Sequence, residues 1–290
     1  MIKTIGVVGA GQMGQGIAQV AAQSGFTVLM ADQNLSTANQ GVEKIRAQLD
    51  RALQKQKITA DEMARTLEAI KGVNTLSDLK DCDLVIEAVS ENLELKKKIW
   101  KELDAYVKPS ALFASNTSSI SITELAAATK RPTQFAGMHF MNPVPVMKLV
   151  EGISAIQTSK ETFAAIRATA EKMGKTFIEA RDIPGFAVNR ILMPMINEAV
   201  YALYEGIASA EDIDTAMKLG TNQPMGPLTL ADFIGLDTCL AIMEVLHQGL
   251  GDSKYRACPL LKQYVSAGWL GKKSGRGFYD YSPAVGTKNS

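Results

Sequence analysis

His139 is the residue of this sequence best placed to do acid–base chemistry. It is one of only two histidines and lies near the end of a predicted strand within FAGMHFMNPVPVMKLVE. Pro143 and Pro145 break that strand directly afterwards, and a new apolar run then leads to Glu151. This strand–turn–strand path predicts that the Glu151 carboxylate returns beside the imidazole. A carboxylate there would orient the ring and fix its tautomer, which suits a general base that takes a proton from a hydroxyl group.

Both histidines also have a purely structural interpretation. A core histidine near a surface glutamate would show the same spacing, so the residues alone leave both interpretations of His139 open. His247 lies in the helical stretch LAIMEVLHQGLG without a comparable setting, and we interpret it as structural.

Ser118 and Asn189 are polar residues that could complete such a site. Ser118 follows the predicted strand ALFAS, at the carboxyl edge where open α/β sheets bind ligands. Asn189 falls on the apolar stripe of a predicted helix, where an unpaired amide costs about 1 to 3 kcal/mol and a substrate would supply its partner. A helix N-cap for the serine and a helix-to-helix hydrogen bond for the asparagine are equally compatible with the sequence.

A glycine-rich turn follows the first predicted strand directly. It reads Gly9-Ala10-Gly11-Gln12-Met13-Gly14, the GxGxxG arrangement. Gly9 permits a tight turn, Gly11 lets the backbone approach a pyrophosphate, and Gly14 lets the next helix pack closely on the strand. The helix N-terminus would then direct amide groups and a positive dipole end toward the phosphates. The motif is weak evidence alone, but its strand–turn–helix context indicates a dinucleotide site.

Asp32 closes the second predicted strand and favours NAD over NADP as the cofactor. An acidic side chain at this point accepts hydrogen bonds from the adenosine ribose hydroxyls. It would repel a 2′-phosphate, and the neighbouring Ala31 and Gln33 supply no cation to offset the repulsion. A cluster of turn glycines beside a surface aspartate is the structural alternative.

A basic strip lies on the next predicted helix. Lys44, Arg51 and Lys55 share one helical face, and Lys57 follows closely. A ligand that carries several phosphates would suit this strip, although most such runs are solvated helix faces.

The elements that must position these residues form an α/β pattern over residues 1–184. Short apolar runs alternate with amphipathic helical stretches, which predicts a doubly wound, mostly parallel sheet of the Rossmann type. The predicted strands are Thr4–Val8, Thr27–Ala31, Leu84–Ala88, Ala111–Ala114, Phe135–Phe140 and Leu149–Glu151. The predicted helices are Gln12–Ser24, Ser36–Gln56, Leu93–Tyr106 and Ser121–Thr129.

A second, all-helical domain is predicted for residues 185–290. The strand signals stop at Pro184 and Gly185, and this pair predicts a hinge between the domains. Helices are expected over Phe186–Leu203, Ser209–Leu219, Leu228–Leu246 and Pro259–Ser266. The first of them carries an apolar stripe made of Phe186, Met193, Ile196 and Val200.

Composition excludes several classes of protein. With 46% hydrophobic and 21% charged residues the chain is globular, and its net charge of +1 offers no field for nucleic acid or an anionic membrane. Cys82, Cys239 and Cys258 form no CxxC pair, so we expect neither a disulfide framework nor a metal site. The first residues leave no room for a secretion signal, and no apolar run approaches the roughly 18 residues that cross a bilayer. A cytoplasmic protein is therefore expected.

The chain resembles the short-chain 3-hydroxyacyl-CoA dehydrogenase family along almost its whole length. The resemblance is carried by GAGQMG, DLVIEAVSENLELKK, ASNTSSISITELA, HFMNPVPVMKLVE, PGFAVNRIL, MGPLTLADFIGLD and GKKSGRGFYDY. It implies an NAD-dependent enzyme that interconverts a short (S)-3-hydroxyacyl-CoA, 3-hydroxybutyryl-CoA above all, and the matching 3-ketoacyl-CoA. It also implies a helical C-terminal domain that forms a homodimer, and a cleft between the domains that closes on the substrate.

The resemblance further implies a role for each site residue. His139 corresponds to the base that takes the 3-hydroxyl proton while hydride passes to the nicotinamide, and Glu151 to its partner. Ser118 and Asn189 match positions that hydrogen-bond the substrate or its neighbours. Contacts with NAD are implied for Glu91, Lys96, Ser118, Asn142 and Lys273, beside Asp32 and the glycine turn. Contacts with CoA are implied for Ser118, Arg51, Lys55 and Lys57.

Two other functions fit the same motifs. A related dehydrogenase could act on a free 3-hydroxy acid, but the basic strip would then have no phosphates to bind. A dinucleotide-binding structural protein could keep the fold and lose turnover. The presence of both His139 and Glu151 argues against that loss, although a fold alone never establishes activity.

Overall fold

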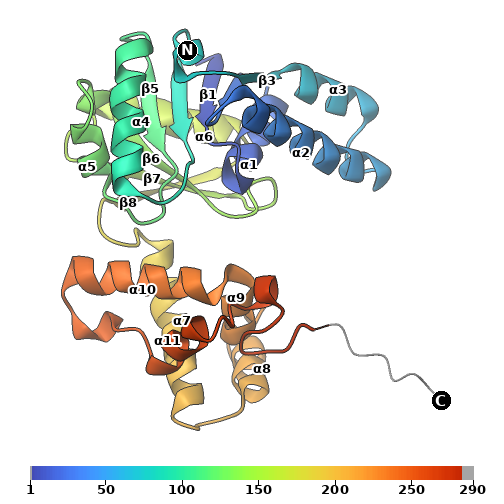
Figure 1. Cartoon of the computed structure of the whole chain (residues 1–290), viewed down its shortest axis with the longest axis vertical. Helices are drawn as coiled ribbons and strands as arrows, with labels where there is room; N and C mark the ends of the chain where they lie inside the picture. The colour runs from blue at the N-terminus through green and yellow to red at the C-terminus, as the bar shows by residue number, and fades with distance from the viewer. Residues whose placement is uncertain (1, 283–290) are drawn as a thin grey trace. The chain divides into compact units, whose positions relative to one another are not determined.

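The computed structural model describes residues 2–282, which fold as two compact units (Figure 1). The chain passes from the first unit to the second between Phe186 and Ala187. Within the described residues, the first unit has two apolar core clusters, one on each face of its sheet, and the second unit has one. No helix within residues 2–282 is long and apolar enough to cross a membrane.

One eight-stranded sheet forms the centre of the first unit, with the strand order β3-β2-β1-β4-β5-β6-β7-β8. All neighbouring strands run parallel except β6 and β7, which run antiparallel. This confirms the predicted fold class. The strands are β1 Thr4–Val8, β2 Thr27–Ala31, β3 Ile70–Val73, β4 Leu84–Glu87, β5 Leu112–Ser115, β6 Phe135–Phe140, β7 Leu149–Ser154 and β8 Thr176–Arg181.

Helices cover both faces of this sheet. Side chains of α1, α2 and α6 share a core with Ile5 and Met30, whereas side chains of α4 and α5 share a second core with Val8 and Val85. Successive strand residues point to opposite faces, so β1 contributes to both cores. The helices are α1 Gln12–Gln23, α2 Leu35–Gln54, α3 Ala60–Glu68, α4 Leu93–Tyr106, α5 Ile122–Ala127 and α6 Lys160–Lys172, with 3₁₀ turns η1 Leu76–Leu79 and η2 Pro132–Gln134.

Four elements of this unit were absent from the sequence prediction: α3, β3, α6 and β8. The strands β3 and β8 are the two edges of the sheet, and their partly exposed residues mix charged with apolar side chains. Helix α3 fully buries only Thr66, but Met63 and Leu67, one helical turn apart, pack partly buried against the first core. A capping box made by Thr59 and Glu62 begins this helix and was the signal that could have identified it.

An aromatic cluster fixes the strands that carry the candidate site. Trp100 of α4 is fully buried against Phe113 of β5 and Phe135 of β6, with ring centroids 4.9 and 4.7 Å away. Large buried rings of this kind contribute much of the free energy that holds a helix to a sheet. The cluster therefore sets the position of β5 and β6 relative to α4.

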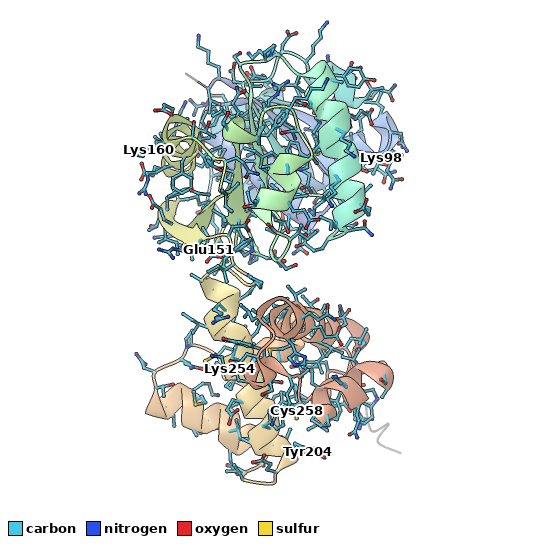
Figure 2. All side chains as sticks on the ribbon, turned by 90° about the vertical axis from the view of Figure 1, so that its left-hand side faces the viewer. Lys98, Glu151, Lys160, Tyr204, Lys254 and Cys258 are labelled. Carbon is cyan, nitrogen blue, oxygen red and sulfur yellow. The ribbon has the colours of Figure 1, made fainter. Side chains whose placement is uncertain are left out.

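The second unit is all-helical over its described residues, as predicted. Asn197 lies within its core, where its amide donates to the Arg256 carbonyl and accepts from the backbone amide of Cys258, which is labelled in Figure 2. The helices are α7 Val188–Tyr204, α8 Ala210–Gly220, α9 Pro227–Ile234, α10 Leu236–Leu250 and α11 Pro259–Ser266, with 3₁₀ turns η3 Ser253–Tyr255 and η4 Lys272–Ser274.

Two helix predictions in this part of the chain were wrong. The predicted helix Leu228–Leu246 is two helices, because Gly235 has a φ of 101° and turns the chain between α9 and α10. The helix predicted to begin at Phe186 begins at Val188 instead. Gly185 and Phe186 have φ values of 80° and 48°, outside the helical range.

Gly14 should be required for stability, whereas Gly11 should not. A Cβ atom at position 14 would overlap the Gly9 carbonyl oxygen, while one at position 11 would meet no heavy atom within 4 Å. We expect Gly14→Ala to lower the free energy of unfolding by about 1 to 3 kcal/mol or more, and the melting temperature by several degrees. Gly11→Ala is the matched control and should melt like the wild type. Equal melting temperatures for all three proteins in a calorimetric scan would contradict the close helix–strand packing.

Candidate active site

His139 and Glu151 lie directly opposite each other on the antiparallel pair β6 and β7. The imidazole Nδ1 is 2.7 Å from the Glu151 Oε2 atom, and both side chains are buried (Figure 2 labels Glu151). An ionised carboxylate only accepts hydrogen bonds, so it selects the tautomer with the proton on Nδ1, and Nδ1–H donates a hydrogen bond to Glu151 Oε2. The lone pair of the neutral ring is then on Nε2. The structure thus brings together the two residues that the sequence analysis singled out for acid–base chemistry.

Phe186 packs beside this pair, which the sequence analysis did not foresee. Its ring centroid is 5.7 Å from that of His139, and the residue is buried. The sequence placed Phe186 on the apolar stripe of the next helix, but its positive φ turns it into the core that β5 and β6 share. An aromatic ring at this distance shields one side of the imidazole from water.

The glycine turn connects β1 to α1 and borders a cavity of about 620 Å³. Gly9 adopts a φ of 108°, which favours glycine, and donates its amide to the Ala31 carbonyl at 2.8 Å. Gly11 lies at the N-terminus of α1 with open space where a Cβ atom would stand. Gly9 and Gly11 line the cavity together with Asp32, Gln33, Val89 and Ser90.

Asp32 ties the glycine turn to the end of β2. Its Oδ2 atom accepts a hydrogen bond from the Ala10 amide at 2.6 Å, and its Oδ1 atom accepts one from the Gln33 amide at 2.7 Å. A carboxylate at the rim of the cavity, facing a helix N-terminus beside an open glycine, fits the adenosine ribose and pyrophosphate of a dinucleotide. The residues present therefore suit an NAD molecule at this edge of the sheet. Of the other predicted turn contacts, Gln12 lies on the exposed side and Met13 packs partly against the core.

Glu91 accepts hydrogen bonds from three successive residues of the loop that follows β5. Its Oε1 atom accepts hydrogen bonds from the Thr117 hydroxyl at 2.5 Å, from the Ser118 amide at 2.9 Å and from the Ser119 amide at 3.0 Å. The Ser118 hydroxyl lies 3.2 Å from the same oxygen. Ser118 is thus no helix N-cap, because Ser121 caps α5 instead. The predicted site residues Glu91 and Ser118 are in direct contact.

Lys96 forms an ion pair with Glu91 and is almost fully buried, with 1% of its side chain exposed. Its ammonium is 3.3 Å from Glu91 Oε2. Burial would raise the pKa of the Glu91 carboxyl, but the Lys96 charge and the hydrogen bonds from the loop outweigh it, so this pKa lies below its usual value. Glu91 is therefore an ionised acceptor near neutral pH.

Asn142 lies in the loop of residues 141–148, which joins β6 to β7. Its Oδ1 atom accepts a hydrogen bond from the Gln12 side chain at 3.0 Å, so the loop touches the start of α1. Lys175 also holds this loop. Its buried ammonium donates to the carbonyl oxygens of Val144 at 2.5 Å and Met147 at 2.8 Å, and burial lowers its pKa. No local pattern predicts this contact, because Lys175 is far from the loop in the chain.

The remaining predicted residues take no part in the contacts described above. Arg51, Lys55 and Lys57 are exposed at the end of α2 and just beyond it. In the second unit, Asn189 is 8% exposed in the first turn of α7, and Lys273 forms an exposed ion pair with Asp237 at 2.6 Å.

Comparison with known proteins gave full-length matches. Residues 4–183 match the model of the 3-hydroxyacyl-CoA dehydrogenase NAD binding domain, and residues 185–281 match that of the C-terminal domain of the same family. The chain is 59% identical to a probable 3-hydroxybutyryl-CoA dehydrogenase of Bacillus subtilis, over 97% of this chain and 98% of the relative. It is 57% identical to the 3-hydroxybutyryl-CoA dehydrogenase of Bradyrhizobium diazoefficiens, over 98% and 97%.

Solved structures give the same result. The crystal structure of (S)-3-hydroxybutyryl-CoA dehydrogenase from Ralstonia eutropha superposes with a TM-score of 0.95 at 53% sequence identity. The match covers 98% of this chain and 100% of that one.

Replacement of Lys175 should loosen the loop of residues 141–148. We expect Lys175→Met to leave the Val144 and Met147 carbonyls without their donor and to lower the free energy of unfolding by about 1 to 3 kcal/mol. Amide hydrogen exchange in residues 141–148 should be faster than in the wild type. Lys160→Met, at an exposed lysine labelled in Figure 2, is the control and should change neither quantity. Unchanged exchange in Lys175→Met would show that the lysine does not hold the loop.

Proposed function

Because this chain belongs to the 3-hydroxyacyl-CoA dehydrogenase family, as its motifs predicted, we propose that it interconverts (S)-3-hydroxybutyryl-CoA and acetoacetyl-CoA. The family match supports NAD as the cofactor, in agreement with Asp32. In the forward direction the substrate and NAD⁺ give the 3-ketoacyl-CoA, NADH and a proton. The observation that carries the proposal is the buried contact between His139 and Glu151.

His139 acts as the general base in this proposal. Its Nε2 lone pair takes the proton of the 3-hydroxyl group, and the imidazolium that forms is stabilised by the Glu151 carboxylate at 2.7 Å. Bound NAD supplies the acceptor for the hydride that leaves the carbinol carbon. Ser118 and Asn189 hydrogen-bond the substrate or its neighbours. The packing of Phe186 on His139 keeps water from that side of the ring.

The cofactor is proposed to lie along the carboxyl edge of the sheet. Its adenosine half fits the cavity beside Asp32, with the pyrophosphate at Gly11 and the N-terminus of α1. Residues 1–184 form the NAD-binding domain in this proposal. The other proposed NAD contacts are Gly9, Gln12, Met13, Gly14, Glu91, Lys96, Ser118, Asn142 and Lys273.

CoA recognition is assigned to the exposed basic strip of Arg51, Lys55 and Lys57, together with Ser118. Cations on an exposed helix face can pair with the CoA phosphates. A free 3-hydroxy acid carries no phosphate, so this strip favours the CoA thioester over the free acid. Residues 185–290 are proposed to complete the substrate site and to form a homodimer. The helical unit exposes large apolar side chains that a partner subunit would cover, among them Ile191, Ile207 and Leu219.

One assay tests the proposed function directly. Loss of NADH absorbance is followed with acetoacetyl-CoA, with longer 3-ketoacyl-CoAs, with free acetoacetate, and with NADPH in place of NADH. We expect the fastest turnover with acetoacetyl-CoA and NADH. Faster turnover of free acetoacetate would favour the 3-hydroxy acid dehydrogenase, and no turnover with any substrate would favour a non-catalytic protein.

The buried, unpaired Cys82, Cys239 and Cys258 fit the proposed cytoplasmic location.

Substitution of His139 should remove turnover and spare cofactor binding. We expect His139→Gln to lower kcat by on the order of a hundredfold or more, since a general base is lost. The dissociation constant for NADH should stay within about threefold of the wild type, because His139 lies outside the cavity at the glycine turn. His247→Gln, at the exposed second histidine, is the control with normal turnover. Near-normal kcat in His139→Gln would remove this residue from the mechanism.

Removal of the basic strip should affect substrates that carry CoA phosphates. We expect Arg51→Ala/Lys55→Ala to raise the KM for acetoacetyl-CoA about tenfold, the loss of one or two charge-assisted contacts. The KM for the N-acetylcysteamine thioester of acetoacetate, which has no phosphates, should stay unchanged. Lys130→Ala/Lys160→Ala removes two exposed lysines of the same unit as a control for net charge. Equal effects on both substrates would rule out phosphate binding by the strip.

A further inference from the structure

A buried ion pair lies at the carboxyl end of β4, and the proposed mechanism does not use its acidic member. Glu87 is the last residue of β4 and is fully buried, and the Lys96 ammonium lies 2.6 Å from its Oε1 atom. Removing two charges from water is costly, and apolar residues of similar size often give an equally stable core. Stability alone therefore does not account for this pair.

Every polar atom of the pair is committed to a fixed partner. Glu87 Oε2 accepts from the Ser115 hydroxyl at 2.7 Å, and Oε1 accepts from the Val89 amide at 2.8 Å as well as from Lys96. Lys96 also donates to the Val89 carbonyl at 3.3 Å. The ammonium is thus held between Glu87 on one side and Glu91 on the other.

The same group of contacts leads to the loop after β5. Ser115, which donates to Glu87, also accepts from the Thr117 amide at 3.2 Å. Glu91, which pairs with Lys96, accepts from the amides of Ser118 and Ser119. The loop is therefore attached to the ion pair at both of its ends.

We infer that Glu87 is a positioning residue of the active site. Its carboxylate fixes the Lys96 ammonium beside Glu91. Glu91 and Ser115 then hold the loop Thr117–Ser119 in place. The loop follows β5. In the strand order, β5 stands between β1, which leads into the glycine turn, and β6, which carries His139. Asn116 joins this loop to β6, because its side-chain oxygen accepts a hydrogen bond from the Phe140 amide at 2.8 Å. A displaced loop should therefore disturb the half of the cofactor near His139 and leave the adenosine half at Asp32 unaffected.

The double variant Glu87→Met/Lys96→Met tests this inference. It removes the buried pair without change of net charge and keeps side chains of similar length. We expect a melting temperature a few degrees below that of the wild type, because the Val89 amide and the Ser115 hydroxyl lose their acceptor, and a dissociation constant for ADP-ribose within twofold. The dissociation constant for NADH should rise at least tenfold, because only NADH reaches the loop. Equal NADH affinity in variant and wild type, or equal weakening of NADH and ADP-ribose, would overturn the inference.

The single variant Glu87→Gln separates Glu87 from a direct contact between Lys96 and the cofactor. It keeps the shape of the side chain and the acceptor for Val89, and it lowers the charge that holds the ammonium. We expect NADH to bind at least threefold more weakly and ADP-ribose to bind normally. Unchanged NADH binding would show that Lys96 acts without Glu87, and would overturn the assignment. Since this variant is close in shape to the wild type, it remains informative if the double variant fails to fold.

Lys97 and Glu124 supply a matched control. They form an ion pair of the same length, 2.6 Å, between α4 and α5, and neither residue makes one of the contacts that hold the loop Thr117–Ser119. Lys97→Met/Glu124→Met should leave both dissociation constants unchanged. The acyl-CoA substrate rests on the proposed function, so kcat with acetoacetyl-CoA is measured separately and should fall about tenfold in the double variant. The ratio of NADH to ADP-ribose affinity tests the role of Glu87 even if acetoacetyl-CoA is not the substrate.

Discussion

Antiparallel pairing of β6 with β7 is the constraint on which the candidate site depends. It places His139 opposite Glu151 by backbone register, within a sheet whose other strand pairs are parallel. Directly paired residues of neighbouring strands have their side chains on the same face, so the imidazole and the carboxylate meet without support from a mobile loop. Lys175 and the contact between Gln12 and Asn142 then hold the segment that links the two strands.

The order of the strands accounts for the rest of the site. Parallel strands end at one edge of the sheet, and a ligand along that edge meets residues from each strand in turn. Polar groups follow this edge in the order of the strands β2, β1, β4, β5 and β6, although their order in the chain differs. They are Asp32, the glycine turn, Glu91, Ser118 and His139. An extended dinucleotide is the kind of ligand that such a row of groups fits.

The sequence predicted the parts of the fold that depend on local patterns. Buried strands, the glycine turn and the return of Glu151 to His139 follow from apolar runs and from the two prolines between them. The edge strands β3 and β8 were missed because exposed strands lack a continuous apolar pattern. Phe186 was misplaced because a positive φ is unusual for a residue other than glycine. The contacts of Glu87 and Lys175 join residues from different elements, and no spacing rule identifies such pairs.

The two hydrogen bonds of Asp32 link cofactor choice to backbone geometry. The carboxylate that would repel a 2′-phosphate is the same group that accepts the Ala10 amide at 2.6 Å within the glycine turn. An engineer who replaces this aspartate to admit NADP also removes an anchor of the turn that receives the pyrophosphate. A redesign of coenzyme preference must therefore supply a new acceptor for that amide, in addition to a cation for the extra phosphate.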